Sequence, residues 1–501
     1  MTGTARIVRN LAGRFNGHRF KQCCLPLPWS LTQPQTYRLQ SASAPRITPA
    51  LNLPVRTWFR YYSSAKMKID SPEFRGLFTP ELKQLAELFE RYQYELRIAG
   101  GAVRDLLTKK QPQDVDFATI ATPDQMKEMF TKEGIRMINA KGEKHGTITA
   151  RINDKENFEI TTLRIDRVTD GRHAEVEFTT DWRTDAERRD LTINSMFLGL
   201  DGTLYDFFNG KEALERCHVA FVGNAATRIQ EDYLRILRYF RFYGRIARES
   251  NKHTPETLQS IRENGHGLAG ISGERIWMEV RKILTGNFAA DLIHCMYDLD
   301  LARHIGIPPE ADLQELHKVY QRSQSLHPHP VTVLSALFKD ENDVLTMEQR
   351  MRISAEERKT ALYVIAERGD KPHKNPLKPY QDIVVCSKEK NIIKYVSEVL
   401  KYRGESQMLV DFRSWDVAKF PLSGKDLLAA GVPKGRGLGG VMETVRQWWM
   451  DSDFKATKEE LLERLQETVR QWWMDSDFKA TKEELLERLQ ETMQEQGKGD
   501  S

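Results

Sequence analysis

Residues 100–119 read "GGAVRDLLTKKQPQDVDFAT", a glycine turn followed by an acidic pair. A strand-like run at 96–99 passes through Gly100 and Gly101 into a segment with the apolar spacing of a helix. Backbone N–H groups at the start of that helix can approach a triphosphate closely, helped by the helix dipole and by Arg104. Taken alone, the glycines are equally well explained by a tight turn that needs a positive φ.

Asp114 and Asp116 stand at i and i+2 of the strand-like run "DVDFA". On a strand both side chains point to one face, about 7 Å apart, which suits two divalent ions about 3.5–4 Å from each other. Glu159, in "NFEITTLR", adds a third carboxylate on a strand that could lie beside the first. Considered by itself, the Asp-x-Asp pair could equally be the solvent-exposed end of a strand. Glu159 by itself could equally be an exposed strand residue. Together the three catalytic candidates predict nucleotidyl transfer with Mg²⁺ held by Asp114 and Asp116.

Strand-like and helical patterns alternate over residues 96–200, whereas only helical patterns follow from about residue 225. One of the helical segments, "TPDQMKEMF", begins with Thr122 and Gln125 in a capping-box pattern. The sequence therefore predicts an α+β protein, with a mixed or antiparallel sheet in an N-terminal head and helices in the remainder. No apolar run approaches the roughly eighteen residues of a membrane span, and the five cysteines show no CxxC spacing.

The first 66 residues have the composition of a mitochondrial transit peptide. Residues 1–69 hold eight arginines and three lysines, and no acidic residue precedes Asp70. Subtracting these eleven from the 75 basic residues leaves 64 against 71 acidic ones, so a polyanionic partner must be held by local basic patches. We expect import into the mitochondrial matrix, and a start at Met67 would give a form for the cytoplasm or nucleus. A basic arm that binds nucleic acid is the alternative.

Three segments, of which the glycine turn with its acidic pair is the first, follow one another in the order of known motifs. "RIAGGAVRDLL" with "QDVDFAT", then "DAERRDLTINSM", then "YDFFNG" resemble successive motifs of the CCA-adding tRNA nucleotidyltransferases of the eukaryotic and bacterial class (class II), in the polymerase-β-like superfamily. The resemblance runs from about Phe74 to Leu284, and "YDFFNG", with Asp206 and Gly210, is similar to the family's hinge between head and neck. It implies that the incoming nucleotide meets Gly101, Arg104, Arg189, Asp190 and Asn194, the last two near its ribose.

"EDYLRILRYFRF" (231–242) resembles the motif by which the family chooses the base. Cytosine and adenine both present an amino donor beside a ring-nitrogen acceptor, whereas uracil and guanine present the reverse. Asp232 accepting from the amino group and Arg235 donating to the ring nitrogen would read C and A without a nucleic-acid template. If the arginines of this segment are considered alone, a basic stripe exposed to solvent is the alternative to a binding role. One helix side is expected to carry Asp232, Arg235, Arg238 and Arg241, and the other Ile236, Leu237 and Phe240.

The segment "GISGERIWMEVRKIL" (270–284) is similar to a later family element, and we interpret it as structural support, with Ser272 capping a helix. Residues 443–466 recur unchanged at 467–490, which indicates a recent tandem duplication or a sequence error, not a solenoid. The expected parts are a transit peptide at 1–66, a nucleotidyltransferase head at 67–205, a neck with the nucleotide-selecting helix at 206–300, a helical body at 301–430 and a helical tail at 431–501.

The resemblance implies a Mg²⁺-dependent enzyme that transfers CMP, CMP and AMP from CTP and ATP to the 3′ end of tRNA, with release of pyrophosphate. The partners are tRNA and the two nucleotides, without a membrane, and a homodimer is left open. A bacterial-type poly(A) polymerase is the nearest rival because it shares the head motifs. A non-catalytic RNA-binding protein is the second rival, against which Asp114, Asp116 and Arg235 argue.

Overall fold

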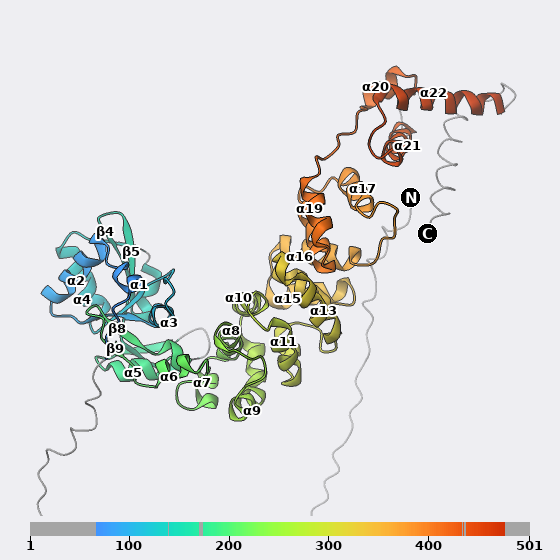
Figure 1. Ribbon diagram of the computed structural model, residues 1–501. Helices are drawn as coiled ribbons and strands as arrows, with labels where there is room; N and C mark the ends of the chain where they lie inside the picture. Colours follow the sequence, from blue (N-terminus) through green and yellow to red (C-terminus); the bar gives the residue numbers. More distant parts are fainter. Residues whose placement is uncertain (1–66, 139, 170–173, 433, 435–436, 476–501) are drawn as a thin grey trace, which may run out of the picture. The chain divides into compact units, whose positions relative to one another are not determined.

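The computed structural model describes residues 67–138, 140–169, 174–432, 434 and 437–475 of the 501-residue chain. The expected transit peptide and most of the second repeat copy lie outside these residues. Strands occur only in the first part of the described chain, and helices make up the rest (Figure 1). In the described ranges no helix is long and apolar enough to cross a membrane. The expected α+β head followed by an all-α remainder is therefore confirmed.

The head is built on a seven-stranded mixed sheet with the strand order β3-β4-β5-β2-β1-β8-β9. β2 and β5 run parallel, whereas the other neighbouring pairs run antiparallel. The β2–β5 register places Asp116 opposite Glu159, which confirms the expected neighbouring strands. The strands of this sheet are β1 (Leu96–Ala99), β2 (Asp116–Thr119), β3 (Arg136–Ile138), β4 (Thr147–Ile152), β5 (Glu156–Thr162), β8 (Phe197–Gly199) and β9 (Leu204–Tyr205), and β6 (Arg164–Thr169) pairs with β7 (Ala174–Phe178) in a separate hairpin.

Short helices cover the head sheet and bury its apolar residues. Thr79 caps α2 by accepting a hydrogen bond from the backbone N–H of Leu82, and the Thr122–Gln125 capping box starts α4 as expected. α2 and α4 pack on β4, while α3 packs on β1. The helices of the head are α1 (Pro72–Arg75), α2 (Pro80–Arg91), α3 (Gly101–Leu107), α4 (Pro123–Lys132) and α5 (Trp182–Glu187), with the 3₁₀ turns η2 (Ala140–His145) and η3 (Thr192–Asn194).

One expectation about the neck is wrong. The spacing of Asp232, Arg235 and the later arginines predicted a single helix, but α7 (Ala225–Glu231) ends before Asp232 and α8 (Arg235–Ile246) begins after it. Asp232 has an extended backbone, with φ −152° and ψ 105°, and its carboxylate accepts a hydrogen bond from the backbone N–H of Leu234. The carboxylate thus competes with helical hydrogen bonding at this joint. Within α8 the expected apolar side is confirmed, since Ile236, Leu237 and Phe240 are fully buried.

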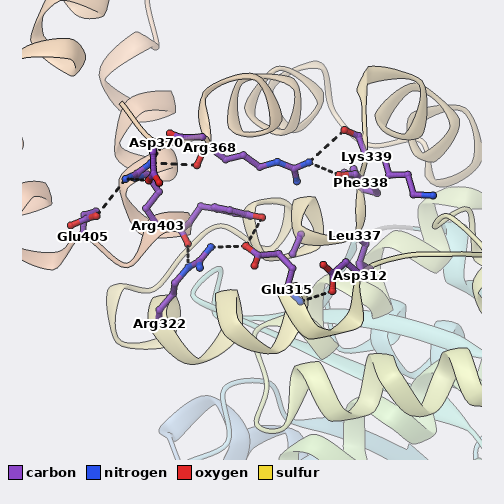
Figure 2. A pocket seen from close by; sticks show the side chains of 13 residues that line it. Asp312, Glu315, Arg322, Leu337, Phe338, Lys339, Arg368, Asp370, Arg403 and Glu405 are labelled. Atoms are coloured by element: carbon purple, nitrogen blue, oxygen red, sulfur yellow. Dashed lines mark hydrogen bonds and ion pairs between the residues drawn. The ribbon is translucent and has the colours of Figure 1, made fainter. Parts of the chain in front are cut away.

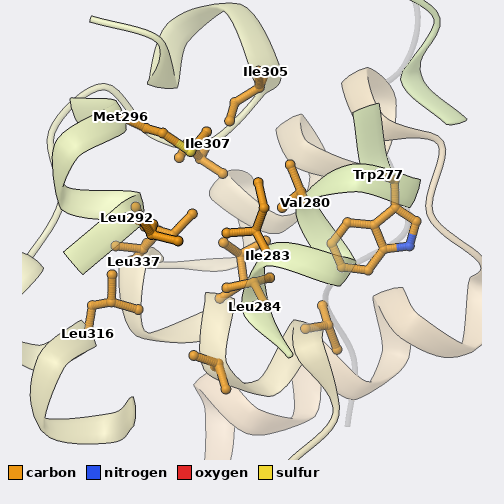
Figure 3. Packing of buried hydrophobic residues seen from close by; sticks show 14 of the residues in the cluster. Trp277, Val280, Ile283, Leu284, Leu292, Met296, Ile305, Ile307, Leu316 and Leu337 are labelled. Carbon is orange, nitrogen blue, oxygen red and sulfur yellow. The ribbon is translucent and has the colours of Figure 1, made fainter. Parts of the chain in front are cut away.

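The neck and the body share one hydrophobic core, which runs from Leu191 to Phe412 and crosses the expected border at residue 300. Figure 3 shows Trp277, Val280 and Leu284 of α10 inside it, as the sequence predicts. Ser272 stands at the N-cap of α10, but its side chain makes no capping hydrogen bond. The remaining elements of this part are α6 (Gly210–Glu215), α9 (Pro255–Asn264), η4 (Gly265–Gly270), α10 (Gly273–Leu284), α11 (Ala289–Asp298), α12 (Ala302–Ile305), α13 (Leu313–Ser323), η5 (Gln324–Leu326), α14 (Pro330–Leu334), η6 (Ser335–Leu337), α15 (Glu341–Met351), α16 (Ala355–Glu367), α17 (Lys378–Cys386), α18 (Ile392–Arg403) and α19 (Ser406–Ser414).

The tail forms a small core of its own from α20 (Gly424–Ala429), α21 (Gly437–Asp451) and α22 (Lys458–Asp475). Val445 and Trp449, from the first repeat copy, are buried in it together with Leu461 and Leu465 from the same copy. Within the described part of the tail, the buried core residues that belong to the repeat come from its first copy.

The segment "YDFFNG" forms a tight connection before the neck. The Asp206 carboxylate accepts hydrogen bonds from the backbone N–H groups of Gly210 and Lys211, both at 2.9 Å, and so caps the start of α6. A Cβ atom added at Gly210 would lie 2.2 Å from the carbonyl oxygen of Thr192 and 3.0 Å from Cγ of Met196. Only glycine allows this close packing of α6 on η3.

Replacing Gly210 by alanine should therefore lower the free energy of unfolding by about 1–3 kcal/mol, because the backbone of α6 or η3 must shift. Thermal or urea unfolding followed by circular dichroism measures the change. Gly439→Ala is the control, since apart from its own helix backbone no atom of the described residues lies within 4 Å of the added methyl group, and alanine favours a helix by about 1 kcal/mol. Equal stability of the two variants would contradict the packing argument.

Candidate active site

A cavity of about 1080 Å³ opens beside the glycine turn and the acidic strand ends of the head. Its wall continues onto α8 and α10 of the neck, so residues from distant parts of the chain face one space. Every site residue predicted from the sequence lines it, which is the first geometric support for treating them as one site. These residues are Gly101, Arg104, Asp114, Asp116, Glu159, Arg189, Asp190, Asn194, Asp232, Arg235, Arg238 and Arg241.

The carboxylates come together at the end of β2. Asp116 begins β2 opposite Glu159, whereas Asp114 lies in a bend just before the strand and not on the strand as expected. Burial raises the pKa of Asp116, and the negative charges of Glu159 and Asp114 add to this, while Arg189 opposes it. A cation bound here would relieve the repulsion among these carboxylates.

Magnesium usually binds through one or two carboxylates, together with water and substrate phosphates. In the described part of the chain no three Asp, Glu, His or Cys side chains are grouped to hold a metal unaided. Asp114 and Asp116 as a two-carboxylate platform fit that manner of binding. Glu159 lies close enough to affect the charge of Asp116, and its own contact with metal stays a prediction.

The glycine turn has the conformation that the sequence suggests. Gly100 has a φ of +65°, and a Cβ atom there would lie 3.0 Å from Nη1 of Arg189. Gly101 then begins α3, whose Arg104 is buried and donates from Nη1 to Oδ1 of Asn194, 90 residues away. Burial lowers the pKa of Arg104, but guanidinium groups stay charged in proteins. The turn and the Arg104 guanidinium, which also pairs with Asp105 at 3.0 Å, thus face the cavity.

Two buried carboxylates hold the arginines of the wall. Asp185 accepts from Arg189 through Nε at 3.2 Å and Nη2 at 3.1 Å, and Asp190 accepts from Nε of Arg238 at 2.6 Å. Burial alone would raise the pKa of Asp190, but the charge and hydrogen bond of Arg238 outweigh it and lower that pKa. Asp190 and Asn194 therefore position arginines in this structure, and their contact with a ribose stays a prediction.

Asp232 and Arg235 face the same cavity from the joint between α7 and α8. Arg235 donates to three acceptors, namely the Glu231 carboxylate at 2.6 Å and the backbone carbonyls of Arg188 and Arg228 at 2.7 and 3.1 Å. These bonds fix the guanidinium in one orientation. Asp232 in turn accepts from Nη2 of Arg275 at 2.7 Å, a contact that the sequence did not reveal.

Several contacts that hold the wall in place escaped the sequence analysis because the two partners are distant in the chain. Arg245 of α8 bonds to Asp105 of α3 at 3.0 Å, and Arg241 donates to the buried Glu279 of α10 at 2.9 Å. No local pattern links residues so far apart. Asp185 was within reach, because it stands three and four residues before Arg188 and Arg189, the helical spacing of ion pairs.

A second pocket, of about 590 Å³, lies in the body. Figure 2 shows its arginines pointing at neighbouring backbone carbonyls. Arg368 donates to the carbonyl of Phe338 at 2.7 Å, and Arg322 donates to that of Tyr402 at 2.6 Å. Because these arginines hold chain segments and carboxylates balance their charge, we assign this pocket a structural role.

Comparison with known proteins decides which nucleotidyltransferase this is. Residues 96–220 match the family model described as the poly A polymerase head domain, and residues 253–313 match one described as a probable RNA and SrmB-binding site of polymerase A. The chain is 56% identical over 404 residues to the mitochondrial CCA tRNA nucleotidyltransferase 1 of Homo sapiens, covering 80% of this chain and 93% of that protein. The chain belongs to the CCA tRNA nucleotidyltransferases. As a member of the polymerase-β-like superfamily, it belongs to a group that generally uses divalent metal ions.

Solved structures of CCA-adding enzymes share the fold. The Bacillus stearothermophilus enzyme in complex with CTP matches with a TM-score of 0.63 at 23% identity, over 81% of this chain and 100% of that one. The Thermotoga maritima enzyme complexed with tRNA matches with a TM-score of 0.59 at 19% identity, over 80% of this chain and 99% of that one. The expected polymerase-β-like head with helical neck, body and tail is thereby confirmed.

Proposed function

We propose that this CCA tRNA nucleotidyltransferase transfers CMP, CMP and AMP from CTP and ATP onto the 3′ end of tRNA at the cavity of the head and neck. The observation that carries the proposal is the joint lining of one space by the acidic end of β2 and by the arginines of α8. The first set suits metal-assisted attack on a phosphate, and the second suits recognition of a base and a triphosphate.

Asp114 and Asp116 would hold Mg²⁺, which lowers the negative charge on the triphosphate and favours attack by the terminal RNA hydroxyl. The chain's own groups then do the remaining work. Gly101 and Arg104 hold phosphate oxygens, and Arg189, fixed by Asp185, offers a further positive charge beside Gly100. The hydroxyl gives its proton to solvent as its oxygen bonds to the α-phosphorus, the bond from the α-phosphorus to the bridging oxygen breaks, and pyrophosphate leaves with that electron pair.

Base choice is assigned to the Asp232–Arg235 pair. The rigidly held Arg235 would donate to the ring nitrogen, and Asp232 would accept from the amino group, a combination that cytosine and adenine share. Uracil and guanine would place an acceptor against the carboxylate. With either of these bases bound, the Asp232 carboxylate and the Arg235 guanidinium would be enclosed without a hydrogen-bond partner, which lowers the affinity for the wrong base.

The purified protein tests this function with a tRNA transcript that lacks CCA. We expect CTP alone to add two nucleotides and CTP with ATP to add three, after which extension stops. Mg²⁺ should support the reaction, and chelation by EDTA should abolish it. Long A tails without any C would point to the rival poly(A) polymerase, and binding of the transcript without extension would point to the non-catalytic rival.

Replacing Asp232 by alanine should relax base choice, because the acceptor for the amino group is lost. We expect the preference for CTP over UTP to fall by about 100-fold or more in kcat/KM, measured by single-nucleotide addition. Asp298→Ala is a matched control, since that aspartate is exposed on α11 outside the cavity. Unchanged base preference in Asp232→Ala would refute the assignment of this carboxylate as the template.

The place of action is inferred from the relatives. The matched Homo sapiens and Mus musculus proteins are named as mitochondrial, and the leader composition agrees with import into the matrix. A shorter form from Met67 for the cytoplasm or nucleus, and a homodimer, stay predictions. Expression of the full chain and of a chain starting at Met67, each fused to a fluorescent protein, tests the first of these.

A further inference from the structure

Asp232, the proposed base-reading carboxylate, is placed on a part of the backbone that cannot orient it alone. It lies at the extended joint between α7 and α8, where its backbone carbonyl accepts one hydrogen bond, from the N–H of Arg235 at 2.9 Å. Its Oδ1 accepts a hydrogen bond from the backbone N–H of Leu234 at 3.1 Å. Its Oδ2 accepts from Nη2 of Arg275 at 2.7 Å, across 43 residues of sequence.

Arg275 is held by a much more rigid element. It stands in the first turn of α10, whose Ile276, Trp277 and Val280 are buried in the core shared by neck and body. The start of that helix is packed tightly, because a Cβ atom at Gly273 would lie 2.1 Å from the carbonyl oxygen of Arg350. Side chains on such an element can hold a partner to within a fraction of an ångström.

The two members of the base-reading pair thus have separate supports. Arg235 is fixed by Glu231 and two backbone carbonyls. In Asp232, Oδ1 is held by the backbone N–H of Leu234 and Oδ2 is held by Arg275. An ionised carboxylate offers about four lone-pair sites and only accepts hydrogen bonds. After Leu234 and Arg275 have each taken one, sites remain for an amino group entering the cavity, which Arg275 also lines.

We propose that Arg275 is a positioning residue for base selection, which keeps the Asp232 carboxylate aimed at the amino group of cytosine or adenine. The inference rests on the proposed function, and specifically on Asp232 as the base-reading group. It predicts that loss of Arg275 harms discrimination between nucleotides, because a freed carboxylate can rotate away or expose room for a wrong base. A direct contact of Arg275 with phosphate would instead weaken all four nucleotides equally.

The test measures kcat and KM for CTP, UTP, ATP and GTP in single-nucleotide addition to tRNA transcripts ending before the CCA and after CC. In Arg275→Ala we expect the preference for CTP over UTP, and for ATP over GTP, to fall about 10- to 100-fold, as for a lost charged hydrogen bond. Arg275→Lys should restore part of that preference, since it keeps the charge without the planar fork. Arg216→Ala, at a side chain that is 75% exposed and outside the cavity, is the control and should keep the wild-type base preference.

The double variant Asp232→Ala/Arg275→Ala shows whether the two residues act together. We expect its base preference to equal that of Asp232→Ala alone, because Arg275 acts through Asp232. A uniform loss for all four nucleotides in Arg275→Ala, or unchanged preference in a folded variant, would overturn the inference while Asp232→Ala still relaxes base choice. Unchanged preference in Asp232→Ala itself would instead remove the proposed template. Thermal unfolding of each variant separates misfolding from these outcomes.

Discussion

Replacing Asp116 by asparagine is expected to abolish CMP and AMP transfer, by at least about 10³-fold in kcat, while the protein stays folded. The amide has the size of the carboxylate but no charge, so it is a poor ligand for Mg²⁺. Loss of the metal removes several kcal/mol of stabilisation from the charge that develops during transfer. Primer extension on a tRNA transcript that lacks CCA, under single-turnover conditions, measures the rate.

The same variant should be at least as stable as the wild type. Burial, Glu159 and Asp114 raise the pKa of Asp116 in the fold, so its charged form is less favourable there than in the unfolded chain. Removing the charge therefore relieves repulsion, and the thermal midpoint should be unchanged or slightly higher. Such a cost to stability at a site of chemistry is a common compromise. Asp124→Asn, at a 91% exposed side chain, is the control with normal activity, and full activity of Asp116→Asn would refute the metal assignment.

The sheet that places Asp116 opposite Glu159 was predictable from the sequence. Both residues lie on short apolar runs after turn-forming segments, and such runs pair in a sheet. The apolar side of α8 was predictable for a similar reason, because helical periodicity places Ile236, Leu237 and Phe240 together. In each case a local pattern carries the information.

The joint at Asp232 was not predictable, since "EDYLRILRY" holds neither glycine nor proline and its periodicity continues through the break. The carboxylate bonding to the Leu234 N–H competes with the helix there, and Arg275 secures the result from 43 residues away. Contacts of that range are set by tertiary packing. For this reason the local pattern of "GISGERIWMEVRKIL" predicts structural support alone, although the segment contributes a side chain to the cavity wall.

The second large effect is expected at Asp185, the buried carboxylate that holds Arg188 and Arg189. Asp185 is 1% exposed and accepts from Nη2 of Arg188 at 2.7 Å, from Arg189 and from the backbone N–H of Arg164. Replacing it by alanine takes this carboxylate away from two guanidinium groups that are only 17% and 20% exposed, and among the described residues only Arg188 keeps another carboxylate, Asp166 at 3.6 Å. Breaking a buried ion pair in this way costs about 3–5 kcal/mol. The free energy of unfolding should fall by that amount, as measured by urea unfolding.

Asp370→Ala is the matched control, because Asp370 pairs with Arg403 at 2.9 Å but is 93% exposed. It should lose at most about 1 kcal/mol, the value of an exposed pair.

Burial would raise the pKa of Asp185, but Arg189 and Arg188 outweigh it and hold the pKa below 3.8. The ionised Asp185 carboxylate therefore stabilises the fold in full at pH values above its unperturbed pKa. This stabilisation is lost as the pH falls through the lowered pKa of the folded protein. The difference between wild type and Asp185→Ala should stay constant from about pH 6 to 8 and shrink in strong acid. A loss no larger than that of Asp370→Ala would show that Asp185 does not support Arg189.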